Sequence, residues 1–172
     1  MQVTTLPISY PPSDWQSACA VSKVTAEESY GSGVAALAMV AGIDYLAGRA
    51  IFARCGLAQR RKNKPALATN LSEMATAVAT AGLMCEPRRW QGWQRFRGLG
   101  IVKIEQPAAG RRGRWTWAVS FTHCEYGIVL FDPHSTMPSF QRMPMDVECS
   151  GFDHYRVIGK WLQVENIHHP NP

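Results

Sequence analysis

The stretch YGSGVAALAMVAG, residues 30–42, contains both a predicted core helix and the main candidate residue for chemistry. A turn of small residues leads into an apolar run, and its hydrophobic spacing predicts a helix from Ser32 to about Ala41. A nucleophile often occupies such a junction between a turn and a helix, and the junction residue here is Ser32. The alternative is a closely packed core helix, because glycine and alanine let helices approach each other in many folds.

Two further helices are expected downstream. Asp44 is typical of a helix cap and predicts a second helix over 45–54. Asn70 and Glu73 have the spacing of a capping box, which predicts a third helix that ends at Gly82. The expected inner face of this third helix consists of Leu71, Met74 and Val78.

After residue 98 the hydrophobic pattern changes to the period of strands. Four strands are expected, and the short turn THCE (122–125) predicts that the second and third form a hairpin. In the last strand, Val157, Gly159 and Trp161 are expected on one face. Helices followed by a mostly antiparallel sheet indicate an α+β fold. The expected strands lie within 99–107, 114–121, 126–133 and 154–165.

This order of elements resembles that of papain-like cysteine peptidases, and most of all the bacterial double-glycine leader peptidases, which trim bacteriocin precursors. In that branch the first helix opens with D-C-G-P-A-A-L-A-M, and GSGVAALAM at 31–39 matches it without a gap. A later strand begins with G-H-W-V-V, here WTWAV at 115–119, and the next ends in an Asp-Pro pair, here Asp132-Pro133. The resemblance covers residues 26–135 and implies N-terminal helices packed on an antiparallel sheet.

At most of the positions that correspond to the family's catalytic residues, this sequence has a different type of residue. Ser32 stands at the position of the cysteine nucleophile, and Thr116 stands at the position of the histidine base. Ala26 replaces the glutamine that holds the oxyanion, whereas Asp132 keeps the role of orienting the base. The resemblance also implies a substrate groove formed by Gly31, Gly33 and Trp117.

These substitutions argue against peptide hydrolysis of the ordinary kind. A helix N-terminus and a nearby imidazolium lower the pKa of a catalytic cysteine from about 8.5 to about 3–4. A serine hydroxyl is not ionised in this way and needs a base in contact, a role that threonine cannot fill. Loss of one oxyanion donor adds about 3–4 kcal/mol to the barrier. We therefore expect that Ser32 is not an ordinary serine nucleophile.

A substitute base is one way in which this site could keep its chemistry. His134 follows Asp132 by two residues, and antiparallel pairing of the hairpin would bring it near Thr116. The alternative is a loop histidine that makes only a turn contact. A deliberate change of cysteine to serine would also account for Ser32, but it would have left a histidine at position 116, so natural decay of the site is favoured.

A basic and aromatic stretch, RRWQGWQRFRG at 88–98, is the second candidate binding region. Arginines and aromatic rings together suit single-stranded nucleic acid. The alternative is an amphipathic element whose rings pack inward while its arginines stay in solvent. We favour an acidic protein partner, with nucleic acid as the least favoured ligand. The candidate binding residues are Arg88, Arg89, Trp90 and Trp93.

The composition sets further bounds. The 172 residues carry a formal net charge of +5, which favours acidic partners, and they contain no apolar run long enough to span a membrane. The first stretch has no secretory signal, so the cytoplasm is expected unless a signal-less export route is used. The five cysteines have no paired spacing and predict reduced thiols, with no metal and no cofactor.

The length predicts one domain, over residues 18–166, preceded by an extended proline-rich segment at 1–17 and followed by a frayed tail at 167–172. We expect a catalytically degenerate papain-like domain that binds a peptide or protein in its former substrate groove, as a bacterial or phage adaptor, inhibitor or effector. One alternative is a thiol peptidase or amidase that is active with a cysteine nucleophile and is inactivated here because serine replaces that cysteine at position 32. The other is a basic nucleic-acid-binding module. The oligomeric state is left open.

Overall fold

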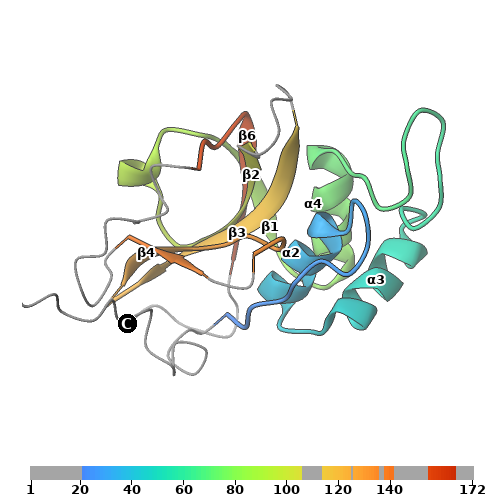
Figure 1. The fold of residues 1–172 in the computed structure, drawn as a ribbon, viewed down its shortest axis with the longest axis horizontal. Coiled ribbons are helices and arrows are strands. Elements are labelled where there is room, and N and C mark those ends of the chain that lie inside the picture. The colour runs from blue at the N-terminus through green and yellow to red at the C-terminus, as the bar shows by residue number, and fades with distance from the viewer. Residues whose placement is uncertain (1–20, 106–113, 125, 136–137, 142–154, 166–172) are drawn as a thin grey trace, which may run out of the picture.

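The computed structural model describes residues 21–105, 114–124, 126–135, 138–141 and 155–165. The segments expected at 1–17 and 167–172 lie outside these described residues. Within them, α-helices pack on one side of a six-stranded antiparallel sheet (Figure 1). This arrangement confirms the predicted α+β fold. The helices are α2 (Ser32–Ala41), α3 (Tyr45–Arg54) and α4 (Leu71–Thr80).

The sheet has the strand order β1-β6-β2-β3-β4-β5, and every neighbouring pair is antiparallel. The first and last strands of the described chain are therefore neighbours at one edge, and the predicted hairpin is the β3–β4 pair. The strands are β1 (Cys85–Arg89), β2 (Leu99–Glu105), β3 (Trp115–His123), β4 (Gly127–Phe131), β5 (Ser139–Phe140) and β6 (Lys160–Val164).

Local capping defines two of the helices, as the sequence predicts. The Asp44 side chain accepts a hydrogen bond from the Ala47 amide at the start of α3. In α4 the capping box is complete, since Asn70 and Glu73 each bond the other's backbone amide through their side chains, at 2.8 and 2.9 Å. None of the helices in the described part of the chain is by itself long and apolar enough to cross a membrane.

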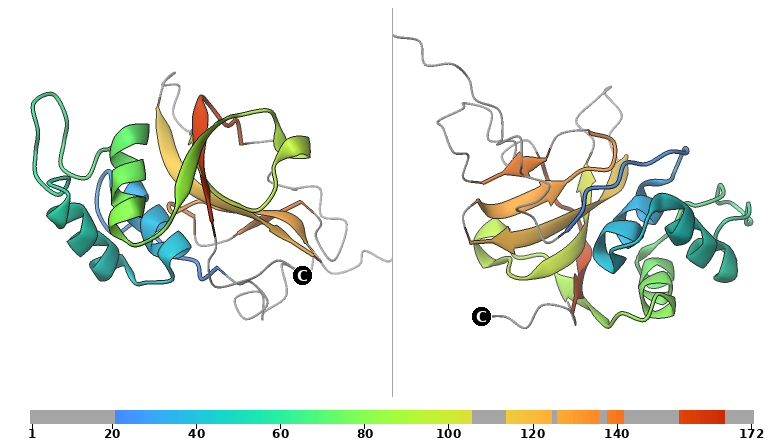
Figure 2. Two further views of the ribbon diagram at one scale, coloured as in Figure 1. Left: turned by 180° about the vertical axis from the view of Figure 1, so that it is seen from behind. Right: turned by 90° about the horizontal axis from the view of Figure 1, so that it is seen from below.

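Helix α2 forms the centre of the fold, because nearly every residue from Ser32 to Met39 is buried. It packs on β2 and β3, while α3 and α4 pack against it from outside. All views show these helices gathered on the same side of the sheet (Figures 1 and 2). The helical side is held by burial of apolar side chains on a tightly packed central helix.

The two faces of the sheet carry different clusters, because strand side chains alternate between them. On β3, Trp117, Val119 and Phe121 point toward the helices and join the larger cluster. Ala118 joins a second cluster on the opposite face. The second cluster consists of Phe96, Val102, Ile104, Ala118, Ile128, Leu130, Val157 and Trp161, with Trp90, Trp93 and Tyr155 packed against it.

Two predicted boundaries were wrong. The last strand begins at Lys160 and not near residue 154, because Gly159 has a φ of +67° and leaves extended geometry. Val157 forms only an isolated bridge with Ile104, although it still shares the second cluster with Trp161. The hairpin turn is also shorter than THCE, since β3 continues to His123.

Gly100 is required by the second cluster. A Cβ at this position would lie 2.5 Å from Cε3 of Trp161 and 3.1 Å from the carbonyl oxygen of Leu162. We predict that Gly100→Ala lowers the free energy of unfolding by about 1–3 kcal/mol, because the added methyl overpacks the site. Urea denaturation measures this loss, and Trp161→Leu in the same chain should recover part of it. Additive losses in the double variant would show that the ring is not the obstacle.

Candidate functional site

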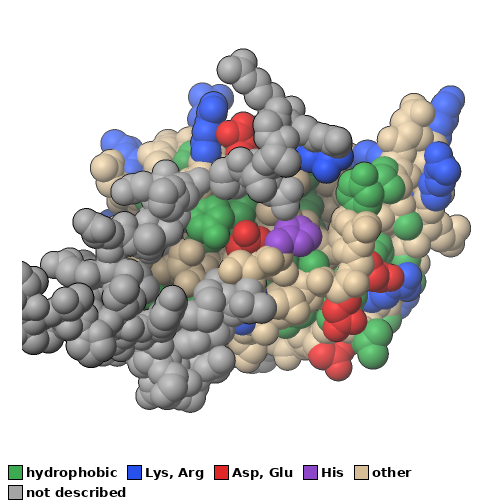
Figure 3. Space-filling view, viewed as in Figure 1, with side chains coloured by type: hydrophobic (Ala, Val, Ile, Leu, Met, Phe, Trp, Pro, Cys, Tyr) green, Lys and Arg blue, Asp and Glu red, His purple; other side chains and the backbone are tan. Residues whose placement is uncertain are grey.

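A pocket of about 500 Å³ opens where α2 begins, next to the start of β3. We call it the α2 pocket. The face of the molecule in Figure 3 presents a histidine, an acidic residue and hydrophobic side chains between the sheet and the helices. The described residues that line the α2 pocket are Ser29, Tyr30, Ser32, Ala68, Thr69, Arg114, Trp115, Thr116, Trp117 and His134.

The Ser32 hydroxyl at the start of α2 is hydrogen-bonded to strand β3 of the sheet. Its Oγ accepts a hydrogen bond of 3.2 Å from the backbone amide of Trp117. Strand β4 pairs with β3 only from Val119 onward, so this amide points past the end of β4 and needs another acceptor. Ser32 is only 6% exposed and fills that need. The residue that the resemblance places at the nucleophile position therefore joins a helix to a strand.

Trp117, the expected wall of a substrate groove, lines the α2 pocket. Its indole Nε1 donates a 2.9 Å hydrogen bond to Thr69 Oγ1, and its ring meets Trp115 edge to face with centroids 5.0 Å apart. The Lys103 ammonium lies 5.0 and 5.6 Å from the centroids of the Trp115 and Trp117 rings. Partial burial lowers the pKa of Lys103. The rings are thus fixed in place and carry a cation beside them.

Thr116, at the base position, lines the α2 pocket with Ser32 but supplies no proton acceptor. Strand alternation places its side chain on the same face as Ala118, which belongs to the second cluster and not to the helical side. Thr116 is 4% exposed, and its Oγ1 has no hydrogen-bond partner among the described residues. It is Trp117, one residue later, whose backbone meets Ser32.

His134 reaches the α2 pocket, as the pairing argument predicts, but it also makes the turn contact expected of a loop histidine. Its backbone amide donates a 2.9 Å hydrogen bond to Asp132 Oδ1. The imidazole is exposed at the rim, and among the described residues no hydrogen bond joins it to Ser32. Asp132 also accepts a 2.9 Å bond at its backbone oxygen from Lys23. Burial lowers the Lys23 pKa, and the charge of Asp132 opposes that shift.

Three predicted site residues, Ala26, Gly31 and Gly33, are not among the described residues that line the α2 pocket. The amide of Ala26 donates to the carbonyl of Pro133 at 2.9 Å, and its methyl group offers no donor to an oxyanion. Gly31 and Gly33 serve packing. A Cβ on Gly33 would lie 2.8 Å from Met74 Cε and 3.1 Å from Trp117 Cδ1. Gly33 lets α2 sit against the sheet, whereas Gly31 leaves room for the Tyr45 hydroxyl of α3.

An ion-paired group holds the turn before α2. Glu28 accepts two hydrogen bonds from Arg49, at 2.9 and 3.0 Å, and one of 3.1 Å from the hydroxyl of Tyr45. The Arg49 hydrogen bonds lower the pKa of Glu28, mainly because they favour its ionised form. Burial, followed by the neighbouring Glu28, raises the pKa of Tyr45 to about 12. The backbone of Glu28 in turn accepts from the Gly31 amide.

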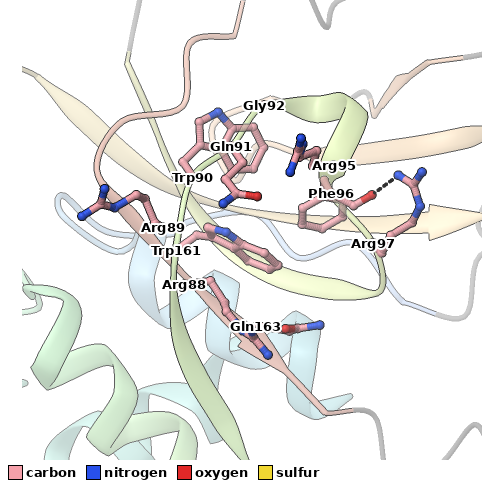
Figure 4. A pocket seen from close by; sticks show the side chains of 10 residues that line it. All are labelled: Arg88, Arg89, Trp90, Gln91, Gly92, Arg95, Phe96, Arg97, Trp161 and Gln163. Atoms are coloured by element: carbon pink, nitrogen blue, oxygen red, sulfur yellow. Dashed lines mark hydrogen bonds between the residues drawn. The ribbon is translucent and has the colours of Figure 1, made fainter.

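The basic candidates form a separate site. Arg88, Arg89 and Trp90 line a second pocket of about 340 Å³, whereas Trp93 packs against the second cluster (Figure 4). The amphipathic alternative describes this stretch correctly, since Phe96 is 2% exposed while the arginines stay exposed. The structure does not bring these residues to the α2 pocket.

Several lining residues could not be found from sequence reasoning. Tyr30 and Arg114 flank the matched motifs, but their polar or aromatic character alone gives no signal of a pocket. Thr69 precedes the cap of α4, and only the fold brings its hydroxyl to Trp117. In the second pocket, Trp161 and Gln163 come from β6, about seventy residues after the basic stretch.

With this geometry established, comparison with solved structures gives the fold a known counterpart. The fold is similar to that of a peptidase domain. The similar structure is the peptidase domain of Streptococcus ComA, a bi-functional ABC transporter involved in a quorum sensing pathway. The TM-score is 0.56 at 16% identity, with 83% of this chain and 96% of that domain covered. No protein-family model and no curated protein matches the sequence. At this identity the likeness supports the papain-like fold alone.

Removal of the Ser32 hydroxyl tests its role as a link. We predict that Ser32→Ala lowers the free energy of unfolding by about 1–3 kcal/mol, because the buried Trp117 amide loses its acceptor. Hydrogen exchange of that amide should accelerate beyond what the global stability loss explains. The matched control is Ser72→Ala on the exposed side of α4. Unchanged protection of the Trp117 amide would contradict the link.

The raised pKa of Tyr45 predicts a loss of stability at high pH. Unfolded tyrosine loses its proton near pH 10, whereas folded Tyr45 keeps it to about pH 12. The native state therefore binds more protons in this window, and stability falls as pH rises from 10 toward 12. Urea denaturation at pH 9, 10 and 11 measures the slope. Tyr45→Phe should flatten it, and an equal slope in both proteins would contradict the assignment.

Proposed function

We propose that this chain is a catalytically degenerate papain-like domain that binds a peptide segment of a partner protein in the α2 pocket without cleaving it. One observation carries the proposal. The Ser32 hydroxyl stands at the nucleophile position but accepts a hydrogen bond from the backbone of Trp117. A hydroxyl in this role already forms part of the contact between helix and sheet. An attacking hydroxyl, in contrast, needs to be free to reach the substrate.

The surroundings of Ser32 support the absence of hydrolysis. Attack by a serine requires a base in hydrogen-bond reach. Thr116 has no basic nitrogen, and in the described structure the His134 imidazole makes no hydrogen bond to Ser32. The Asp132 carboxylate, which would orient a base, instead holds the backbone of His134. Ala26 adds no oxyanion donor.

The walls of the α2 pocket suit a peptide. Trp115 and Trp117 give it a rigid aromatic side, and Tyr30, which is 57% exposed, stands at its opening. Fixed aromatic rings bury peptide surface at little cost in side-chain entropy. The volume of about 500 Å³ accommodates a few residues of an extended chain. These features favour capture of a short segment.

The charges around the pocket favour an acidic group on that segment. Helix α2 begins with no side-chain cap and no acidic residue in its first turn, so its positive end is not compensated locally. Arg114 lines the same pocket. A carboxylate, from an acidic side chain or a free C-terminus, would be stabilised by both. We therefore expect the partner to present an acidic segment, which this chain would bind as an adaptor or inhibitor.

Peptide binding and cleavage can be tested together. We predict that acetylated hexapeptides rich in glutamate bind the protein, that lysine-rich ones bind at least tenfold more weakly, and that mass spectrometry finds every peptide intact. Trp115→Ala and Arg114→Glu should each weaken binding by about five- to tenfold. The control is Arg54→Glu, which makes the same change of charge at an exposed position of α3. Equal loss from the control would contradict binding in this pocket.

Restoring a thiol separates the proposal from the alternative of an inactivated hydrolase. We expect Ser32→Cys to bind the peptides without turnover, because position 116 offers no base to form a thiolate. Turnover by Ser32→Cys at ordinary peptidase rates would establish the alternative. Cleavage of any hexapeptide by the unaltered protein would overturn the proposal outright.

A further inference from the structure

The second pocket lies on the face of the sheet opposite the helices and is not used by the proposed function. We call it the arginine pocket. Its volume is about 340 Å³, near the lower end of what small-ligand sites occupy. Its lining residues are Arg88, Arg89, Trp90, Gln91, Gly92, Arg95, Phe96, Arg97, Trp161 and Gln163 (Figure 4).

The floor of the arginine pocket is a set of interlocked aromatic rings. Phe96 and Trp161 meet with centroids 5.0 Å apart, and Trp90 packs against both at 6.2 and 6.4 Å. Phe96 is 2% exposed and Trp161 is 7% exposed. Because these ring faces are occupied by one another, the floor gives rigid shape and offers little free face for base stacking.

The rim of the pocket carries an excess of positive charge. All four arginines are exposed, and Figure 4 shows them distributed around the Trp161 ring. Arg88 pairs with Glu86 at 3.0 Å, with both side chains more than half exposed. Arg89 and Arg95 make no ion pair within the described residues. Four arginines with one glutamate leave three net positive charges around a single hollow.

One of these cations is held in position before any ligand arrives. The Arg97 guanidinium donates to the backbone oxygens of Gln94, at 3.0 Å, and Phe96, at 2.7 Å. A guanidinium has five N–H donors, so those on its other side stay available. Like charges around one hollow repel one another, and an anion placed among them is attracted by all of them. Such an arrangement indicates a site for a ligand with dense negative charge.

We propose that the arginine pocket binds the polyphosphate group of a small ligand, with two or three adjacent phosphates. Guanidinium groups pair with phosphate oxygens through two parallel hydrogen bonds. Adjacent phosphates concentrate several negative charges in a volume that fits the hollow, which separate carboxylates do not. The amides of Gln91 and Gln163 add neutral donors beside the arginines.

Two macromolecular ligands fit the observations less well. Single-stranded nucleic acid needs exposed ring faces on which successive bases stack, and the rings here are packed against each other. An acidic peptide could add as a strand at the free edge of β1, but Pro87 in that strand supplies no backbone donor for such pairing. The structure therefore favours a compact anion.

Calorimetric titration of the full chain tests the proposal, with tripolyphosphate, pyrophosphate and orthophosphate as probes at one fixed ionic strength. We expect tripolyphosphate to bind at least tenfold more tightly than orthophosphate, with pyrophosphate between them. Arg89→Ala and Arg95→Ala should each weaken tripolyphosphate binding about tenfold. Arg54→Ala and Arg60→Ala remove equal charges from exposed sites elsewhere and should change it less than twofold.

Further probes identify the ligand class. Adenosine triphosphate should bind as tightly as tripolyphosphate or more tightly, which would extend the site to nucleotides. Equal binding of the three phosphates, or equal losses in all four arginine variants, would overturn the proposal. So would hexaglutamate binding that is tighter than tripolyphosphate binding and is lost in Arg89→Ala and Arg95→Ala, or binding of oligothymidylate that strengthens with strand length. Because these variants lie away from the α2 pocket, peptide binding there should be unchanged in all of them.

Discussion

The attachment of α2 to β3 through Trp117 is the interaction on which the described structure depends. Its amide bonds to Ser32 at the helix start, and its indole bonds to Thr69 just before α4. One tryptophan thus ties the sheet to two helices in a buried region, where each lost partner would leave a polar group unsatisfied. Gly33 makes the contact possible, since its missing side chain leaves room for the ring.

The same interaction gives the Ser32 hydroxyl a structural purpose. A hydroxyl at this point satisfies a strand amide that the short β4 leaves without a partner. The helix end retains its uncompensated positive charge, and the aromatic wall stays fixed. In the proposed function, the features that suit binding remain while the acid–base chemistry is missing. This separation of binding from chemistry is what the proposed function requires.

Much of the fold could be predicted from sequence because its signals are local. Asp44, Asn70 and Glu73 define helix ends through bonds that span three residues. The β3–β4 hairpin follows from alternation and a short turn. Strand β1 gave no such signal, because CEPRR lacks alternation and is held by β6 from the far end of the chain. Gly159 delays the start of the last strand to Lys160 through a backbone conformation that the pattern did not reveal.

The site was less accessible to prediction than the fold. The resemblance led to Ser32, Trp117 and His134, and these line one pocket. The resemblance could not show that the Ser32 hydroxyl accepts a hydrogen bond from the Trp117 amide, because this bond depends on where β4 ends. The arginines were found by composition, yet their hollow exists only once Trp161 arrives beneath them.

Alternation along the strands has a consequence for the molecule as a whole. Side chains of β3 that point one way help to enclose the α2 pocket, while the opposite face of the same sheet carries the rings beneath the arginines. No described residue lines both hollows. A chain of 172 residues is in this sense two-sided. Under the two proposals, each side of the sheet would bind its own ligand.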